Sequence, residues 1–595
     1  MEQSLSIAVL PFVNMSSDVE NEYFSDGMTE EIINALAKLK RLKVTSRTSS
    51  FYYKNKNLSL KNIGLELGVS AVLEGSIRRS DDTIRITAQL IDTKDDFHFW
   101  SETWDRKLEN VFDIQDEISL LIADKLRENF GHFEIEDHLV NSQTTNFEAY
   151  ENYLKGNYHF QKWNHGDIQI ALQKYQRAIH LDSKHAESYL GIAKCYNFLG
   201  VMGLSPTEVS FEEVKKYLTK ALALNDQIPE AYYLLSNLSF WGEWDISKSL
   251  AYIDKAIEIN PNYAIGHQFK SFVLILINQK MMALKHVDIA IDLDPRSSEI
   301  FFAKGYIYYM LEDYERSLEL MEMCLAITPE DMLANIIKGC CFLLTNRADE
   351  VINMFSSEDA THIDEANKIG MIAIAHAFKS DQANVAKYHK LLEEKLENDN
   401  AERALSYLFL IYVISNQSDR AFDYLQKAVD IKSPLIFILI PDPLLNPIKS
   451  APRYKAIFNS VFGKIPRIDK AKRVKKVIMS DHQTEIYAEK LNHLLAVQMP
   501  YLDSSLSLRA LSEQIGIHPN QLSWLINERF QKNFNEFINQ YRVEAFKRKA
   551  KDPKNAHLTL IGLAYESGFN SKTVFNTFFK KETGITPKEY LNKIS

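Results

Sequence analysis

Apolar residues in the first part of the chain are spaced in a way that predicts alternating strands and helices. The short run Ile7–Phe12 is apolar throughout, which predicts a strand. Apolar side chains then recur at helical spacing over Met28–Leu39 and again over Leu60–Leu67. Asp26 stands where an acidic residue stabilises a first helical turn, so the first of these helices is predicted to start beside it.

Further strand-like runs follow, and together they predict a small α/β domain over residues 1–130. Leu42–Ser46 has the character of a short strand, and Ala71–Arg78 and Thr83–Asp92 form a pair of longer ones. The polar sequence Ser80-Asp81-Asp82 lies between the longer runs and has the length of a hairpin turn.

From residue 146 to about 435 the apolar pattern is helical and repeats itself. Copies of one short pattern, Ala-Ile-Asp-Leu-Asp-Pro and its relatives, begin at Ala178, Ala221, Ala256, Ala290 and Cys324. Their spacings are 43, 35, 34 and 34 residues, and a last copy at Ala428 lies 104 residues further on, close to three periods. A period of 34 is that of the tetratricopeptide (TPR) repeat, whose helix pairs bury their apolar faces by stacking. We therefore predict a TPR solenoid over residues 146–460.

A solenoid of this kind presents a concave groove, in which we expect a peptide, a protein or a small ligand to bind. One repeat is rich in aromatic residues that we interpret as repeat core rather than as a ligand cage: Tyr232, Tyr233, Phe240, Trp241 and Trp244.

After a basic linker predicted at 461–483, the pattern becomes that of a helix-turn-helix. An apolar helix face runs from Leu508 to Ile515, Gly516 stands at the turn, and Pro519 opens a second helix. That helix buries Leu522, Leu525 and Ile526, which leaves these polar and aromatic residues on its other faces: Asn520, Gln521, Ser523, Trp524 and Asn527. Such side chains near the start of a second helix are what readout of a DNA major groove requires.

The same plan recurs about 50 residues later. Gly568 marks the turn, and Ser571 caps a helix that runs to Lys581. Between the units, Phe534–Lys549 has the pattern of one long helix that would hold them at a fixed separation. Two linked units suit successive major grooves, about 34 Å apart on one side of the duplex. We therefore predict an all-α double helix-turn-helix domain over residues 484–595.

Composition and motifs narrow the class of protein. With 595 residues, 46% hydrophobic and 25% charged, the chain is expected to hold several globular and mainly helical domains. Its four cysteines show no metal or disulfide spacing, and no apolar run approaches the 18 or more residues of a membrane helix. Phosphate-loop, nucleophile-elbow and zinc-protease motifs are missing from the sequence. We expect a cytoplasmic protein that is no enzyme and has no membrane segment, cofactor or metal.

Charge divides the chain unevenly. From Lys464 onward there are 22 Lys and Arg against 13 Asp and Glu, a balance of +9, whereas the whole chain carries −10 and residues 1–463 therefore carry −19. A basic carboxyl-terminal part on an acidic body indicates that one domain meets phosphate and the rest does not.

Four segments near the amino terminus have characteristic sequences: IAVLPFVNMSSDVENEYFSDGMTEEIINALAKL, VTSRTSSFYYK, IGLELGVSAVLEGSIRR and RITAQLIDTKDDFHFWSETWDR. Over about residues 5–128 they resemble the TolB-amino-terminal-like domain that precedes TPR arrays in bacterial signalling proteins. The resemblance implies an α/β fold and brings no catalytic residues.

Two carboxyl-terminal motifs, LSLRALSEQIGIHPNQLSWLINERFQKNFNEFINQYRVEAFK and LTLIGLAYESGFNSKTVFNTFFKKETGITPKEY, resemble the DNA-binding domain of the AraC/XylS family over about residues 490–592. The resemblance implies base contacts from Asn520, Ser523 and Trp524 in the first unit. It implies others in the second unit, from Lys572, Thr573, Asn576 and Thr577. That family often carries an Arg at the place of Trp524, so this ring is expected to pack or to touch a thymine methyl group. Asn520 and Asn576 are the strongest candidates, because Asn pairs bidentately with adenine.

Gln521, Asn527 and Lys580 complete the predicted DNA-binding set. The chain is thus interpreted as a sequence-specific transcription regulator of the AraC family with a sensing or protein-interaction region. The alternative is a TPR scaffold or signalling adaptor whose last domain does not read DNA. A signal in the solenoid could release a basic tail held against the acidic body, or it could change dimerisation, so a homodimer remains an open alternative.

Overall fold

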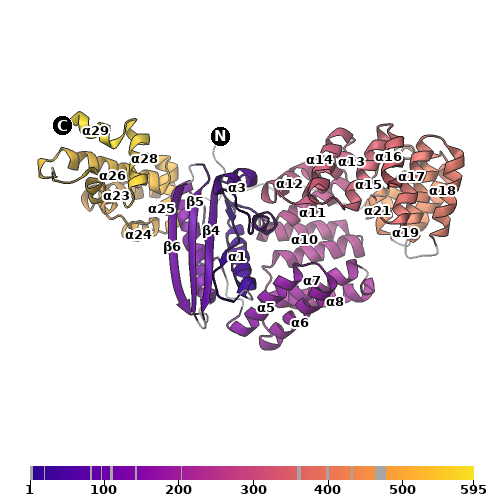
Figure 1. Ribbon diagram of the computed structural model, residues 1–595, viewed down its shortest axis with the longest axis horizontal. Coiled ribbons are helices and arrows are strands. Elements are labelled where there is room, and N and C mark those ends of the chain that lie inside the picture. Colours follow the sequence, from indigo (N-terminus) through magenta and orange to yellow (C-terminus); the bar gives the residue numbers. More distant parts are fainter. Residues whose placement is uncertain are drawn as a thin grey trace.

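The computed structural model is mainly helical and has three parts in chain order, as predicted (Figure 1). It describes residues 5–18, 21–80, 83–94, 97–107, 111–140, 144–202, 204–357, 363–396, 401–430, 433–462, 478–555 and 557–594. Figure 1 shows the α/β part in the middle, with the helical solenoid on one side of it and the carboxyl-terminal helices on the other. No helix in these ranges is long and apolar enough to cross a membrane.

A mixed sheet forms the centre of the first part. Its strands are β1 (Ser6–Val9), β2 (Val13–Asn14), β3 (Lys43–Val44), β4 (Ala71–Ser80), β5 (Thr83–Asp92) and β6 (Phe97–Lys107). The order is β3-β1-β4-β5-β6, with β2 beside β4; β1 is parallel to both neighbours, and β4 to β6 are antiparallel. The predicted hairpin is confirmed, because Ser80 stands opposite Thr83, while the turn residues Asp81 and Asp82 lie outside the described ranges. Strand β6 was not predicted.

Four helices accompany the sheet: α1 (Glu22–Ala37), α2 (Arg47–Phe51), α3 (Leu60–Leu67) and α4 (Val111–Phe130). Helix α3 has the predicted bounds, with Ser59 capping its start and Gly68 ending it in the left-handed conformation. The predicted start of α1 beside Asp26 is wrong. The helix begins at Glu22 because Tyr23 and Phe24 are buried in the core under the sheet and extend its apolar face toward the amino terminus.

The second part is a solenoid of eight helix pairs within the described residues, which confirms the TPR prediction. The pairs are α5 (Phe147–Phe160) with α6 (His165–Leu181), α7 (Ala186–Val201) with α8 (Thr207–Leu224), α9 (Pro229–Asn237) with α10 (Ile246–Ile259), α11 (Ala264–Leu276) with α12 (Lys280–Leu293), α13 (Ser298–Met310) with α14 (Tyr314–Ile327), α15 (Met332–Leu344) with α16 (Ala348–Ser356), α17 (Glu365–Phe378) with α18 (Gln382–Glu394), and α19 (Ala401–Ile414) with α20 (Ser418–Asp430). The long gap between Cys324 and Ala428 thus holds three periods. The aromatic repeat is core, as interpreted: Phe240 is fully buried, with Tyr233 and Trp241 packed beside it. All four cysteines are buried free thiols.

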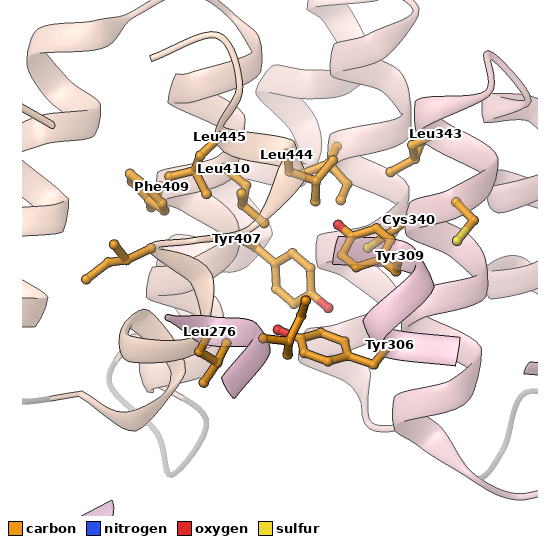
Figure 2. Close-up of a cluster of buried hydrophobic side chains, with 14 of the residues drawn as sticks. Leu276, Tyr306, Tyr309, Cys340, Leu343, Tyr407, Phe409, Leu410, Leu444 and Leu445 are labelled. Atoms are coloured by element: carbon orange, nitrogen blue, oxygen red, sulfur yellow. The ribbon is translucent and has the colours of Figure 1, made fainter. Parts of the chain in front are cut away.

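The end of the solenoid folds back onto the first helices of two later pairs, α13 and α19. Helices α21 (Pro434–Leu439) and α22 (Pro452–Phe462) flank the turn η5 (Pro443–Leu445). Figure 2 shows Leu444 and Leu445 in one apolar cluster with Tyr306 and Tyr309 of α13 and Tyr407 of α19. The Tyr309 hydroxyl donates to the buried Asp442 carboxylate at 2.7 Å. This part of the predicted groove is therefore occupied by the chain itself.

Loops of the solenoid also hold the edge of the sheet. The Asn262 side chain accepts from the Val44 amide at 3.1 Å and donates to the carbonyl groups of Ala37 and Leu42 at 2.8 and 2.9 Å. The Ser46 amide donates to the Leu293 carbonyl at 2.8 Å. Edge strand β3 is thereby covered, and the α/β part and the early repeats are joined by specific hydrogen bonds.

A buried histidine pair makes the solenoid sensitive to acid. Nε2 of His267 lies 3.1 Å from the Pro261 carbonyl oxygen and therefore donates, so Nδ1 of His267 accepts from Nδ1 of His286 at 2.8 Å. His267 must be neutral for this arrangement, because its Nδ1 accepts a hydrogen bond. Burial lowers the pKa of His267 to about 4 and that of His286 to about 3.

We predict that acid destabilises the solenoid through this pair. Because the folded-state pKa values lie below the ordinary 6.5, the neutral pair contributes fully above pH 6.5, and its contribution is lost as pH falls toward 4. Between pH 7 and pH 5 the loss is on the order of 2 kcal/mol for each ring. Urea unfolding followed by helical circular dichroism should show that H267Q/H286Q removes most of this pH dependence; an unchanged pH dependence would contradict the assignment.

Candidate nucleic-acid interface

The carboxyl-terminal part contains two helix-turn-helix units with the predicted local signals. Its helices are α23 (Asp481–Val497), α24 (Leu508–Ile515), α25 (Pro519–Phe530), α26 (Phe534–Lys551), α27 (Leu560–Glu566), α28 (Lys572–Thr583) and α29 (Pro587–Ile594). Gly516 ends α24 at a φ of 76°, Pro519 is the first residue of α25, and the Ser571 side chain caps α28. Helices α25 and α28 are the second helices of the two units.

Helix α26 belongs to both units at once. Its Phe537 and Ile538 lie in the first core, with Leu511, Ile515, Leu522, Leu525 and Ile526. Its Val543 and Phe546 lie in the second, with Leu563, Ala564, Phe569, Phe575 and Phe579. Because one rigid helix supplies both cores, it sets the separation of α25 and α28.

A polar joint fixes the second unit against the first. The buried Arg542 guanidinium donates to the Tyr501 carbonyl at 2.8 Å and to the Asp503 carbonyl at 2.9 Å. Burial lowers the pKa of Arg542 to about 10. Gly568 has a φ of 94° and lies directly against Tyr501 and Arg542, where a Cβ atom would collide with the Tyr501 carbonyl oxygen. A glycine is therefore required where the two units meet.

The second reading helix presents its predicted residues to solvent. Lys572, Thr573, Thr577 and Lys580 are exposed, and Asn576 is half-buried, on the face of α28 away from the core. This face is open along the helix.

The first reading helix is covered by the amino-terminal part of the chain. The Asn520 side chain accepts from the Ile135 amide at 3.1 Å and from the Arg127 guanidinium, and it donates to the Ile135 carbonyl at 3.0 Å. Asn527 lies against Gly131, since a Cβ atom there would be 2.9 Å from the Asn527 amide oxygen. All these partners lie outside the helix-turn-helix domain, so Asn520 is not part of that domain's core.

The remaining predicted residues of α25 differ in exposure. Ser523, expected on an outer face, is buried, and Trp524 is half-buried. The Gln521 side chain accepts from the His518 amide at 3.1 Å and completes the helix cap.

Helix α4 makes most of this cover. Glu128 accepts from the Leu508 amide at 2.8 Å, and Asp124 pairs with Arg509 at 3.1 Å. Asn129 accepts through its carbonyl from Asn533 at 2.7 Å and through its side chain from Asn535 at 2.9 Å. These α4 residues were not predicted. Helical spacing of Ile114, Ile118, Ile122 and Leu126 would have revealed the helix, but no pattern along the chain shows that it meets α24 and α25.

Arg127 is the most deeply buried group in this contact, with its side chain 1% exposed. Burial lowers the pKa of the guanidinium, against the opposing effect of Asp124 and Glu128. Burial, with the charge of Arg127, also lowers the pKa of His132 to about 4. The contact therefore holds a desolvated positive charge between two carboxylates.

Much of the predicted basic charge lies in the linker. The stretch Lys464–Lys476 is outside the described residues, and residues 464–477 contain seven Lys and Arg and one Asp. Residues 478–595 contain 15 Lys and Arg and 12 Asp and Glu, a balance of only +3. Among the described residues, no group of His, Cys, Asp and Glu is placed to hold a metal ion.

Two family matches bear on these domains. Residues 511–593 match the family described as a helix-turn-helix domain, in agreement with the predicted AraC-type resemblance. Residues 2–121 match the second domain of HilA/YgeH-like transcriptional regulators. Beside its TPR region, the chain thus carries one domain that matches a helix-turn-helix family and one that matches a domain of transcriptional regulators. The TolB-like resemblance of the first domain stays a prediction beside this match.

Individual relatives are similar over parts of the chain only. A putative adenylate cyclase 3 of Rhizobium meliloti is 35% identical over 239 residues, 40% of each chain. The transcriptional regulator HilA of Salmonella typhimurium is 20% identical over 36% of this chain and 32% of its own. A TPR protein of Parabacteroides merdae is 14% identical with a TM-score of 0.33 and covers 45% of this chain and 99% of its own. The chain thus spans less than half the length of these two sequence relatives.

We predict that Gly568→Ala destabilises the helix-turn-helix regulator domain far more than Gly584→Ala. Both glycines have positive φ, but Gly584 faces open space, so alanine there costs only the backbone strain of about 1 to 2 kcal/mol. At Gly568 the collision with Tyr501 adds to that strain, for a total of at least about 3 kcal/mol. Chemical unfolding followed by tyrosine and tryptophan fluorescence measures the difference; equal losses would show that the joint tolerates a side chain.

Proposed function

We propose that the chain is a sequence-specific transcription regulator that reads DNA with α25 and α28 in successive major grooves. The observation that carries this proposal is the shared helix α26, which contributes Phe537 to one core and Phe546 to the other. A rigid separation of two reading helices is of use where the target has a fixed helical repeat.

Each reading helix supplies a set of contacts in this proposal. In α28, Asn576 reads a base edge, Thr573 and Thr577 lie beside it, and Lys572 and Lys580 reach phosphates. In α25, the corresponding set is Asn520, Gln521, Trp524 and Asn527, and the predicted Ser523 is left out because it is buried. The Asn side chains are the specific readers, because their amide groups match adenine, and the lysines position the helix without reading sequence.

The α/β domain and the solenoid form the regulatory region of the proposed protein. Since the first helices of the later repeats are covered by residues near Asp442, a peptide or protein partner would bind elsewhere along the solenoid or displace that segment. One candidate is a cavity of about 470 Å³ between Leu276, Lys280, Lys449 and Phe458. We expect a cytoplasmic regulator that is not an enzyme, because one matched family is a helix-turn-helix domain and the other is a domain of transcriptional regulators. The name of the Rhizobium relative concerns that protein and includes a catalytic function that we do not extend to this chain.

We predict that Asn576→Ala weakens binding at one base pair of the target. Duplexes selected from a random pool with the full chain provide the target, and titration by fluorescence anisotropy measures affinity. The loss should be roughly 1 to 3 kcal/mol on the selected duplex and negligible on random duplex. Asn592→Ala, which removes an exposed Asn from α29, is the matched control. An equal loss on both duplexes would remove Asn576 from the reading set.

Salt dependence tests DNA binding itself. Phosphate contacts release counterions, so affinity should fall steeply with salt, and Lys572→Ala should reduce the logarithmic slope by about one. Binding without salt dependence, or no binding to any duplex, would favour the TPR scaffold instead.

A further inference from the structure

We infer that residues 124–135 imitate DNA toward the first reading helix. We call these residues the lock, and we call the chain closed when the lock contacts α25, as it does in this structure. In the closed chain α25 is unavailable to DNA while α28 stays available. This inference rests on the proposed function. It concerns the regulation of the site, and its basis is the chemistry of the contacts that cover α24 and α25.

The backbone N–H and carbonyl of Ile135 offer Asn520 what an adenine offers. Adenine presents a donor, the N6 amino group, and an acceptor, N7, to an Asn side chain in the major groove. Ile135 presents its N–H to the Asn520 amide oxygen at 3.1 Å and its carbonyl to the Asn520 amide nitrogen at 3.0 Å. Asn520 thus makes in the closed chain the donor and acceptor pair that it would make with a base.

Two carboxylates of α4 take positions suited to phosphates. Glu128 accepts from the Leu508 amide at the start of α24, and a helix start with free amide groups is a common phosphate site. Asp124 pairs with Arg509 one residue further along. The start of α24 thus binds two negative charges, one at the Leu508 amide and one at Arg509, where in this proposal the phosphates of DNA would bind.

The cover extends along α25 and excludes the duplex. Gly131 lies against Asn527, two turns beyond Asn520, and Asn129 holds the start of α26 through Asn533. A reading helix in the major groove has its outer face against base edges. That face cannot contact α4 and a base at once, so the two occupants compete.

The second reading helix lacks a comparable cover among the residues that the structure describes. Lys572, Thr573, Thr577 and Lys580 are exposed, so the closed chain retains one usable reader. We therefore expect the closed chain to bind a single half-site weakly and the open chain to bind both. What the lock controls is the second groove contact, rather than all DNA binding.

The lock is connected to the solenoid through helix α1. The segment after α4 is held by Asp116, which accepts from the amides of Leu139 and Val140, and by Lys38, which follows α1 and donates to the Leu139 carbonyl at 2.9 Å. Helix α1 in turn touches α5, where Tyr23 donates to Glu151 at 2.5 Å. Figure 1 places the α/β domain between the solenoid and the helix-turn-helix domain, so its contacts give a change in the repeats a route to α25.

The first test opens the lock. D124A/E128A removes the carboxylates that face α24, and E102A/E117A removes two exposed carboxylates of the same domain as the charge-matched control. Duplexes are selected from a random pool with the opened variant. On them, we expect D124A/E128A to bind about tenfold more tightly than the parent chain, because a larger fraction is competent, and its footprint to lengthen by about one helical turn. The control should bind like the parent.

The second test closes the lock covalently, in case the opened variant loses its fold. Asn129 and Asn535 are in side-chain contact at 2.9 Å, and the four natural cysteines are buried, so N129C/N535C offers an accessible pair for oxidation. We expect the oxidised chain to show the short footprint and the weak affinity, and reduction with dithiothreitol to restore the parent behaviour.

The outcomes separate the lock from the proposed function. Equal affinity and footprint for the opened, parent and oxidised chains would overturn the lock and leave DNA reading intact. A gain shared by E102A/E117A would also overturn it, since general charge repulsion would then be the cause. Absence of binding by every form would refute the proposed function and the lock together.

Discussion

The shared core of α26 is the constraint on which the reading domain depends. One helix packs Phe537 among the side chains of the first unit and Phe546 among those of the second, so neither unit is able to rotate without disrupting its own core. Arg542 and Gly568 add a close polar joint at the junction. A native core is packed too densely for gradual adjustment. The two reading helices therefore have a fixed separation and are not independent modules joined by a flexible linker.

Rigidity of the readers makes a lock on one of them effective. Because α25 and α28 cannot move independently, α4 prevents them from entering both grooves at the same time, although it holds only the first helix. The contact consists of hydrogen bonds and ion pairs around the desolvated Arg127, and burial of charge makes such contacts specific without making them strong. An interface of this kind suits a switch, since its polar groups are able to hydrogen-bond to water when it opens, and those of α24 and α25 are then available to DNA.

Surfaces of the solenoid are also occupied by other parts of the same chain. Its later repeats enclose the segment around Asp442, and its early loops hold the sheet edge through Asn262, so the chain itself fills surfaces that a TPR array usually offers to partners. The α/β domain lies between solenoid and reader and touches both. Contacts of that domain therefore give a signal from the repeats a route to the helix-turn-helix units.

The sequence alone determined what depends on neighbours along the chain. Helical periodicity, the 34-residue repeat, Gly516, Pro519 and Ser571 predicted the TPR pairs and both helix-turn-helix units, because periodicity and capping are local properties. It misplaced the start of α1 and missed β6 and α4, whose extents are set by burial against the rest of the domain. Only the tertiary structure decided that Asn520 meets Ile135 while Asn576 lies half-buried among exposed side chains. The two residues have similar local settings, and the difference between them comes from a helix nearly 400 residues away, a distance that no local pattern encodes.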